Sequence, residues 1–253
     1  MRRYKQEQIE SYERGRLEWL NRSEKLRDIV LSRSFNSDRA EQFSREGFAR
    51  RLGYLEHAMH RLDELYPPNS IGASRDTVRD VELLIQAFVM NVFGALDNLA
   101  WIWALENNVK RPDGKDLRRT EVVFDGPKAK TLVKSLTPAL CNVIADMKDW
   151  FAALRIYRDG VAHQIPIYIP FLFNESEDIE SKRLNDAIRD AIADGDHGLV
   201  VELYSKRNEL GDYGALMALS VEHSTMMLHP QMVCDLATVV NLGEQMFTEL
   251  ERL

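Results

Sequence analysis

The 253-residue sequence lacks features that mark several large classes of protein. It has no glycine-rich phosphate-binding loop and no dinucleotide-binding glycine fingerprint, which argues against nucleotide-driven motors and nicotinamide-dependent enzymes. Only two cysteines occur, Cys141 and Cys234, without a CxxC pair or metal-ligand spacing around them. Both lie inside apolar helical patterns, so we expect small buried residues in a reducing compartment.

Signals for a membrane and an excess of positive charge are also missing. The sequence begins without an apolar leader segment and has no run of about 18 apolar residues, so we expect a cytoplasmic protein. The formal charge of −7 argues against a dedicated, sequence-indifferent nucleic-acid binder, which is normally basic. Basic residues do outnumber acidic ones in residues 1–50. A solvated helix face is the favoured explanation for this bias, and contact with RNA is the alternative.

Apolar residues at helical spacing dominate the sequence, so we predict a mainly α fold, a long-helix bundle with a small β element after residue 163. The first helix has few apolar residues, so we expect it to pack weakly or against a partner chain. The third is apolar over much of its girth and should be central. The expected helices cover 2–33, from Asn36 or Ser37 to about 66, from Ser74 or Asp76 to about 108, and from Thr137 to about 161.

The remaining chain predicts one mixed segment and a last helix. Pro166 and Pro170 limit the extended stretch 165–173 to an edge strand. Residues 214–228 can supply a strand beside it. Helices are expected over 177–194 and 198–210 and from Pro230 onward. We predict one domain, 1–253, with N-terminal helices in 1–70, a core helix pair in 74–163, a mixed insert in 164–228 and a C-terminal helix in 229–253.

The chemistry of this sequence is concentrated in residues 154–163, where an apolar helical pattern ends with Arg158, Asp159 and His163. Arginine presents a planar cationic fork that suits phosphate, and histidine transfers protons near neutral pH. Cleavage of a phosphodiester without a metal needs such a pair. The spacing alone arises by chance, because Arg51 and His57 nearly reproduce it. Since Gly160 should loosen the helix, the two side chains can converge at a distorted helix end or across two chains.

The segment 157–163 resembles the R-x(4–6)-H motif of the HEPN superfamily, in which a polar residue usually follows the arginine at the end of a long helix. The helix containing 93–100 resembles the preceding helix of that family, which often carries an acidic or polar residue facing the motif. The resemblance covers roughly residues 77–165. It implies a dimerising domain of four to five helices. Many members are metal-independent ribonucleases with a site composed from two chains, and others are interaction or ligand-binding modules.

This resemblance implies roles for the motif residues. Arg158 would hold the scissile phosphate, His163 would act as general acid or base, and Asp159 would orient one of them. Arg155 is one turn before Arg158, and two roles stay open for it: an ion pair with Asp97 or another acid of the central helix, or a second phosphate clamp. The alternative for Arg158 and His163 is a helix C-terminus stabilised by cations.

Our first hypothesis is therefore a HEPN-like, metal-independent endoribonuclease of the toxin or defence type. It would need no cofactor, act on RNA as a homodimer, and pair with an antitoxin. The alternative is a non-catalytic helical dimer that binds a partner protein or a small ligand. A metal-dependent hydrolase using His57 and His60 is weaker, because no third ligand has a defined spacing. Trp101 and Trp103 could stack on bases, but core positions are favoured.

Overall fold

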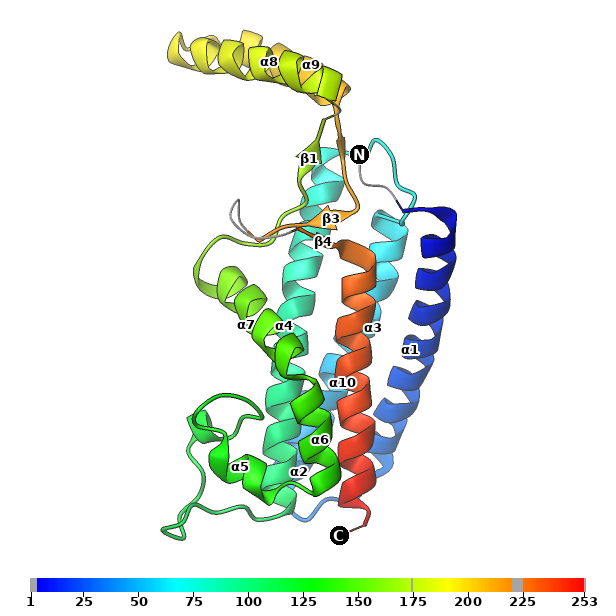
Figure 1. Cartoon of the computed structure of the whole chain (residues 1–253), viewed down its shortest axis with the longest axis vertical. Coiled ribbons are helices and arrows are strands. Elements are labelled where there is room, and N and C mark those ends of the chain that lie inside the picture. Colours follow the sequence, from blue (N-terminus) through cyan, green and yellow to red (C-terminus); the bar gives the residue numbers. More distant parts are fainter. Residues whose placement is uncertain (1–3, 174, 220–224, 253) are drawn as a thin grey trace.

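The computed structural model describes residues 4–173, 175–219 and 225–252 and confirms a mainly α fold. Long helices run side by side in a bundle, with two small antiparallel sheets near one end (Figure 1). The helices are α1 (Gln6–Ser32), α2 (Asp38–Gln42), α3 (Arg50–Leu65), α4 (Arg75–Glu106), α5 (Lys130–Ser135), α6 (Pro138–Asp146), α7 (Lys148–His163), α8 (Glu175–Ala193), α9 (His197–Leu210) and α10 (Leu228–Leu250). The strands are β1 (Phe171–Leu172), β2 (Asp212–Tyr213), β3 (Leu216–Met217) and β4 (Met226–Met227).

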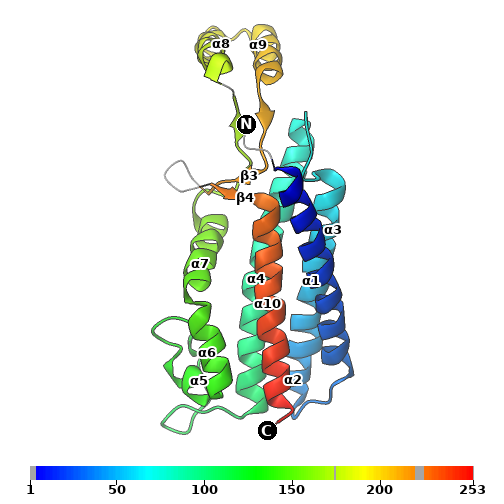
Figure 2. The same cartoon turned by 45° about the vertical axis from the view of Figure 1, so that its right-hand side comes forward.

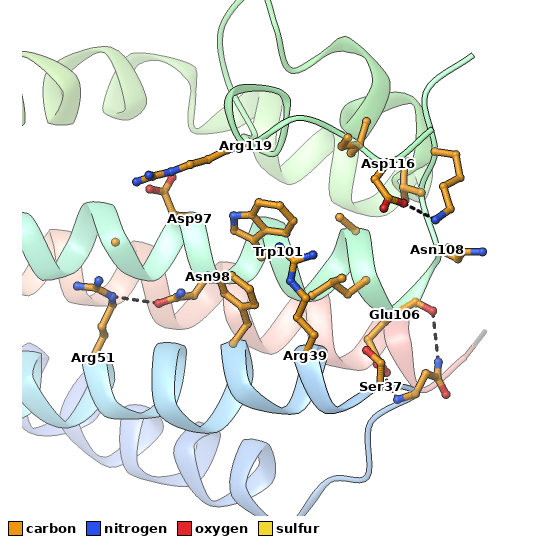
Figure 3. Close-up of a pocket in the computed structure, with 18 residues that line it drawn as sticks. Ser37, Arg39, Arg51, Asp97, Asn98, Trp101, Glu106, Asn108, Asp116 and Arg119 are labelled. Atoms are coloured by element: carbon orange, nitrogen blue, oxygen red, sulfur yellow. Dashed lines mark hydrogen bonds and ion pairs between the residues drawn. The ribbon is translucent and has the colours of Figure 1, made fainter. Parts of the chain in front are cut away.

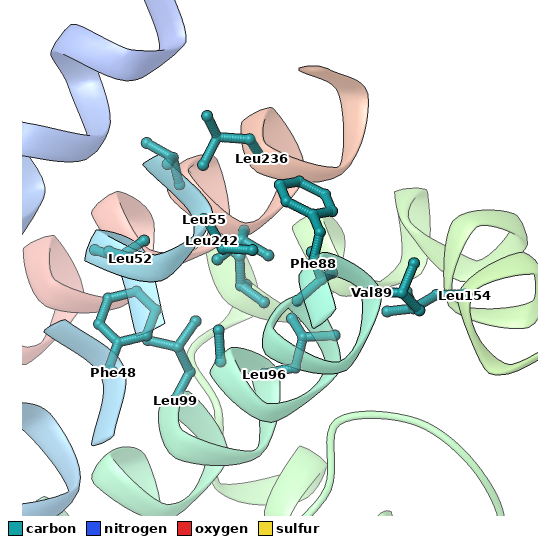
Figure 4. Packing of buried hydrophobic residues seen from close by; sticks show 14 of the residues in the cluster. Phe48, Leu52, Leu55, Phe88, Val89, Leu96, Leu99, Leu154, Leu236 and Leu242 are labelled. Atoms are coloured by element: carbon teal, nitrogen blue, oxygen red, sulfur yellow. The ribbon is translucent and has the colours of Figure 1, made fainter. Parts of the chain in front are cut away.

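Helix α4 is the centre of the core, as the sequence predicts. Its first turn is capped by Ser74, whose hydroxyl accepts a hydrogen bond from the Thr77 amide at 3.0 Å. Helices α3, α7 and α10 pack around it (Figure 4). By length and composition α4 could cross a membrane, but its apolar side chains form this core, which is compatible with a soluble protein. The core residues labelled in the figure are Phe48, Leu52, Leu55, Phe88, Val89, Leu96, Leu99, Leu154, Leu236 and Leu242.

The polar helix α1 packs along α10 within the same chain, so the expectation of weak packing was wrong. Four of its apolar residues form one buried stripe, Tyr12, Leu20, Leu26 and Val30, whereas Leu17, Ile29 and Leu31 are exposed. Charged side chains reinforce the contact, since Arg22 forms an ion pair with Glu244 of α10 at 2.5 Å. A narrow apolar stripe with flanking ion pairs is enough to hold a helix of this length.

The predicted helix that ends near residue 66 has the right extent but not a regular winding. Ser37 caps it, accepting a hydrogen bond from the Ala40 amide at 3.2 Å. Between α2 and α3 the chain forms a π-helix, η1 (Phe43–Ala49), which packs against α4. There Gly47 lies so close to Asn98 of α4 that a β-carbon would collide with the amide. Such π turns are rare and are frequent at functional sites.

The motif helix was predicted as one helix and is two, because the chain breaks at Met147 between α6 and α7. Its start is as expected, with Thr137 as the cap and Pro138 at the first position. The predicted loosening at Gly160 was wrong, since α7 continues through His163. Gly160 is buried, and a β-carbon there would collide with Leu219. The glycine thus admits a neighbouring segment and does not end the helix.

The mixed insert forms a helical hairpin, α8 and α9, that stands beyond the end of the bundle on a stem of β1 and β2 (Figure 2). The hairpin buries a small apolar cluster of its own. The stem is held to the bundle by the Tyr66 hydroxyl, which donates to the Gly214 carbonyl at 3.1 Å. The predicted second strand is divided into β3 and β4, and residues 220–224 lie outside the described part of the chain.

A buried carboxyl links the motif helix to the C-terminal helix. The indole Nε1 of Trp150 on α7 donates to Asp235 of α10 at 2.8 Å, and the Gln231 amide donates to the same oxygen at 2.8 Å. Burial raises the pKa of Asp235 to about 6, although both hydrogen bonds lower it. These hydrogen bonds therefore hold α7 against α10, but burial of the carboxylate costs desolvation free energy whenever Asp235 is ionised.

We predict that Asp235→Asn changes the pH dependence of stability. Because the folded-state pKa is raised, the contribution of Asp235 is fully present below about pH 4 and is lost as the pH rises through 6. The free energy of unfolding of the wild type should fall relative to the variant by about 2 kcal/mol between pH 4 and 7. Urea denaturation at several pH values measures this difference. Parallel curves for the two proteins would contradict the prediction.

Candidate functional site

Arg158 lies on the side of α7 that faces α4. Its guanidinium carbon is 4.5 Å from the ring centroid of Phe93, in a cation–π contact. Its Nη1 forms an ion pair with Asp159 at 2.8 Å, and its Nε is buried without a hydrogen-bond partner in the described part of the chain. Arg158 is therefore fixed in position, and Asp159 contacts the arginine of the motif.

Asp97 of α4 lines the same cavity as Arg158, a space of about 190 Å³ between α4, α7 and the loop before α5, which we call the motif pocket. Burial raises the pKa of Asp97, and the positive charges of Arg158, Arg51 and Arg119 oppose that rise. An acidic residue of the central helix thus faces the motif. This is the arrangement that the resemblance implies.

Arg155 also lines the motif pocket, but its partner is not on the central helix. It forms an ion pair with Asp125 of the loop before α5. The proposed pair with Asp97 is therefore wrong for this side chain. Arg155 is exposed, so the pair with Asp125 contributes little stability, on the order of 1 kcal/mol or less.

His163 is exposed and is the last residue of α7. Five residues along a regular helix rotate a side chain by about 140°, so His163 and Arg158 leave α7 on different faces. Among the described residues no hydrogen bond or ion pair joins the two. Since the helix end is regular, one chain does not bring them together.

The outer face of α7 presents apolar surface beside His163. Ile156 is 51% exposed and is seven residues, two turns, before His163. The neighbouring helix α4 exposes Leu83 at 65% and Met90 at 40%. Because seven residues make almost two full turns, Ile156 and His163 lie on the same outward face of α7.

A larger cavity of about 1020 Å³ lies on the other side of Asp97, between α2, η1, α4 and the loop 108–119 (Figure 3). We call it the aromatic pocket. Trp101 lines it and is stacked on Phe43 with ring centroids 5.2 Å apart and an interplanar angle of 17°. Arg39 covers Trp101 at 4.7 Å from the ring centroid. The core position expected for Trp103 is confirmed, whereas Trp101 is half-buried and packs against the edge of the core.

Arg51 of α3 enters the same pocket through a gap left by a glycine. A β-carbon on Gly94 would overlap the Arg51 guanidinium. The guanidinium donates at 3.0 Å to the amide oxygens of Asn98 and Asn91, so its hydrogen bonds leave the charge unneutralised. The sequence identified Arg51 only as a chance match to the motif spacing. A sequence signal that could have indicated this close approach is Gly94, a glycine inside an otherwise apolar helix.

The other candidate residues are distributed over the surface. His57 and His60 are exposed on α3, as favoured from the sequence. Within the described ranges, no group of three His, Cys, Asp or Glu side chains could hold a metal ion. Cys141 is half-buried and Cys234 is exposed, both as free thiols, so the expectation that both are buried was wrong. Comparisons with family models, with curated proteins and with solved structures found no match to this chain.

We predict that Asp97→Asn leaves the free energy of unfolding at pH 7 unchanged or higher. Burial dominates the rise in the pKa of Asp97, so the ionised carboxyl is less favoured in the folded state than in water. A neutral isostere removes this penalty. Urea denaturation at pH 7 measures the effect. A loss of roughly 2 kcal/mol or more would show that attraction to the three arginines outweighs desolvation.

Proposed function

We propose that the chain is a metal-independent endoribonuclease of the HEPN type, working in the cytoplasm, with a site composed from two copies. The observation that carries the proposal is the division of the motif over two faces of α7. Arg158 is held against Phe93 and near Asp97, whereas His163 is exposed on the face that also carries Ile156. This division is expected for a site completed by a second chain.

The chemistry follows from the two residue types. One His163 takes the proton of a ribose 2′-hydroxyl, and that oxygen attacks the adjacent phosphorus. The bond to the leaving 5′-oxygen breaks, and the second copy's His163 donates a proton to that oxygen. Arg158 stabilises the negative charge that builds on the phosphate. The products are a 2′,3′-cyclic phosphate and a free 5′-hydroxyl.

We expect cleavage of single-stranded RNA in the presence of a chelator. Either His163→Ala or Arg158→Ala should lower the rate by about 100-fold or more, the scale of one acid–base or one charge-stabilising contact. Analysis of the product ends should detect the cyclic phosphate. His57→Ala is the matched control, since His57 is exposed and outside the motif, and it should leave the rate unchanged.

Mixing wild type with His163→Ala tests the composite site directly. If both histidines of a dimer are needed, an equal mixture after exchange of chains should retain about a quarter of the wild-type rate. A site complete in one chain would retain about half. The same mixture with His57→Ala should retain the full rate. No cleavage of any RNA by the wild type would reject the ribonuclease.

The dimer should depend on the exposed face of α7. We expect Ile156→Lys to weaken self-association, because it places a charge in the apolar part of the proposed contact. Sedimentation equilibrium at micromolar concentration measures the loss. Ile179→Lys is the matched control, since Ile179 is a similarly exposed isoleucine, 63%, on α8. An Ile156→Lys protein that associates like the wild type would place the contact elsewhere.

The alternative is a non-catalytic helical dimer that binds a partner protein, such as an antitoxin. The hairpin of α8 and α9 favours it, because this element projects from the bundle and leaves apolar residues exposed (Figure 2). The exposed residues there include Ile192 at 56% and Val201 at 70%. Retained dimerisation without RNA cleavage would support this alternative.

A further inference from the structure

The aromatic pocket holds chemistry that the motif does not use. Its walls combine a stacked aromatic pair, Trp101 and Phe43, with the cationic side chains of Arg51 and Arg119 (Figure 3). Aromatic rings bind planar bases by stacking, and guanidinium groups bind phosphate. A molecule that contains both a base and a phosphate would use both walls.

The spacing of these groups along α4 fits one nucleotide. The guanidinium of Arg51 lies over Gly94, and Trp101 is seven residues further along the helix. At 1.5 Å per residue this is about 10 Å, close to the length of a base with its sugar and phosphate. Arg119 lies beside Asp97, midway between the two ends (Figure 3). The cavity, about 1020 Å³, is large enough for such a ligand.

The charge at the Asp97 end of the pocket also favours an anion. The pocket is lined by three carboxylates, but Glu106 and Asp116 form ion pairs with Arg33 and Lys110. The remaining carboxylate, that of Asp97, is acted on by three arginines, Arg51, Arg119 and Arg158. The hydrogen bonds of Arg51 go to amide oxygens of Asn98 and Asn91, which orient the guanidinium and leave its charge in place. This local excess of positive charge occurs in a chain whose formal charge is −7.

Two glycines allow the arrangement. Gly47 in the π-helix lets Asn98 approach η1, and Gly94 provides the space that the Arg51 guanidinium fills. A side chain at either position would displace a group that lines the pocket. The shape of the pocket therefore depends on the absence of a side chain at these two glycines as well as on the side chains that line it.

We infer that the aromatic pocket is a nucleotide-binding subsite, in which a base stacks on Trp101 and Phe43 and a phosphate is bound by Arg51 and Arg119. Arg39, which now covers Trp101, would move to admit the base or would stack on its outer face. The ligand is either a free nucleotide or one nucleotide unit of an RNA strand. Asp97 lines both this pocket and the motif pocket, so an RNA unit bound here would lie next to Arg158.

The test is a binding titration with 5′-AMP and, separately, a short single-stranded oligoadenylate. It uses calorimetry on the His163→Ala protein so that no strand is cut. Trp101→Leu and Arg119→Gln should each weaken binding about tenfold or more. Gly94→Ala should do the same by displacing the Arg51 guanidinium. Adenosine and ribose 5-phosphate, which each lack one half of the ligand, should bind more weakly than 5′-AMP by a similar factor.

Each variant has a matched control outside the pocket. Trp19→Leu removes a tryptophan that is also covered by an arginine, Arg22. Arg118→Gln removes the neighbouring exposed charge, and Gly15→Ala adds a methyl group at ordinary contact distance on α1. The controls should bind like the parent protein, and circular dichroism should show that every variant is folded.

The outcomes separate this inference from the proposed ribonuclease. Binding of 5′-AMP that depends on Trp101 indicates a free nucleotide ligand. Binding of the oligoadenylate alone, with the same dependence, indicates an RNA unit. Either result stands if the wild type cleaves no RNA. No binding of either probe at millimolar concentration, or equal binding by Trp101→Leu and the parent, would overturn the inference, even if RNA is cleaved.

Discussion

The burial of α4 is the constraint on which the rest of the structure depends. A helix that is apolar over much of its girth must be covered on several sides, and α3, α7 and α10 cover it here. The side that remains between α3 and α7 carries the residues that are not apolar enough for the core. Asp97 and Asn98 lie there on one turn and Trp101 on the next, so both pockets open along this strip of one helix.

The position of the motif follows from the same constraint. Helix α7 packs on α4 through Leu154 and Tyr157, which are buried, and this contact turns Arg158 toward Phe93 and Asp97. The hydrogen bond from Trp150 to Asp235 adds a second attachment, to α10. With two attachments on its inner side, α7 can present only its outer face, with Ile156 and His163, to another molecule.

The sequence predicts the parts of this architecture that depend on periodicity and on local signals. The central helix, its Ser74 cap, the Ser37 cap and the proline start at Thr137 follow from such signals. The packing of α1 against α10 does not follow from the sequence. A stripe of buried residues as sparse as Tyr12, Leu20 and Leu26 predicts a helix but does not indicate which helix it packs against. The break at Met147 and the π turn of η1 depend on tertiary packing, which overrides local propensity.

The candidate site, like the fold, could be predicted only in part from the sequence. Arg158 and Asp97 were placed together by the resemblance, and the structure brings them to one cavity. Arg51 was dismissed, because its importance comes from Gly94 and Asn98, on a helix more than forty residues away in the sequence. A glycine within an apolar helix shows that something approaches closely, but not what approaches. Only the fold identifies the group that fills the space.

Net charge is a poor guide to the local field at Asp97. The positive charges of Arg51, Arg119 and Arg158 all act on this one carboxylate, while the formal charge of the whole chain is −7. A ligand with one or two phosphates meets the local field, which is screened over about 10 Å in 0.1 M salt. A long polyanion meets the acidic surface as well. Such a distribution favours recognition of a single nucleotide position over tight, non-specific binding along a strand.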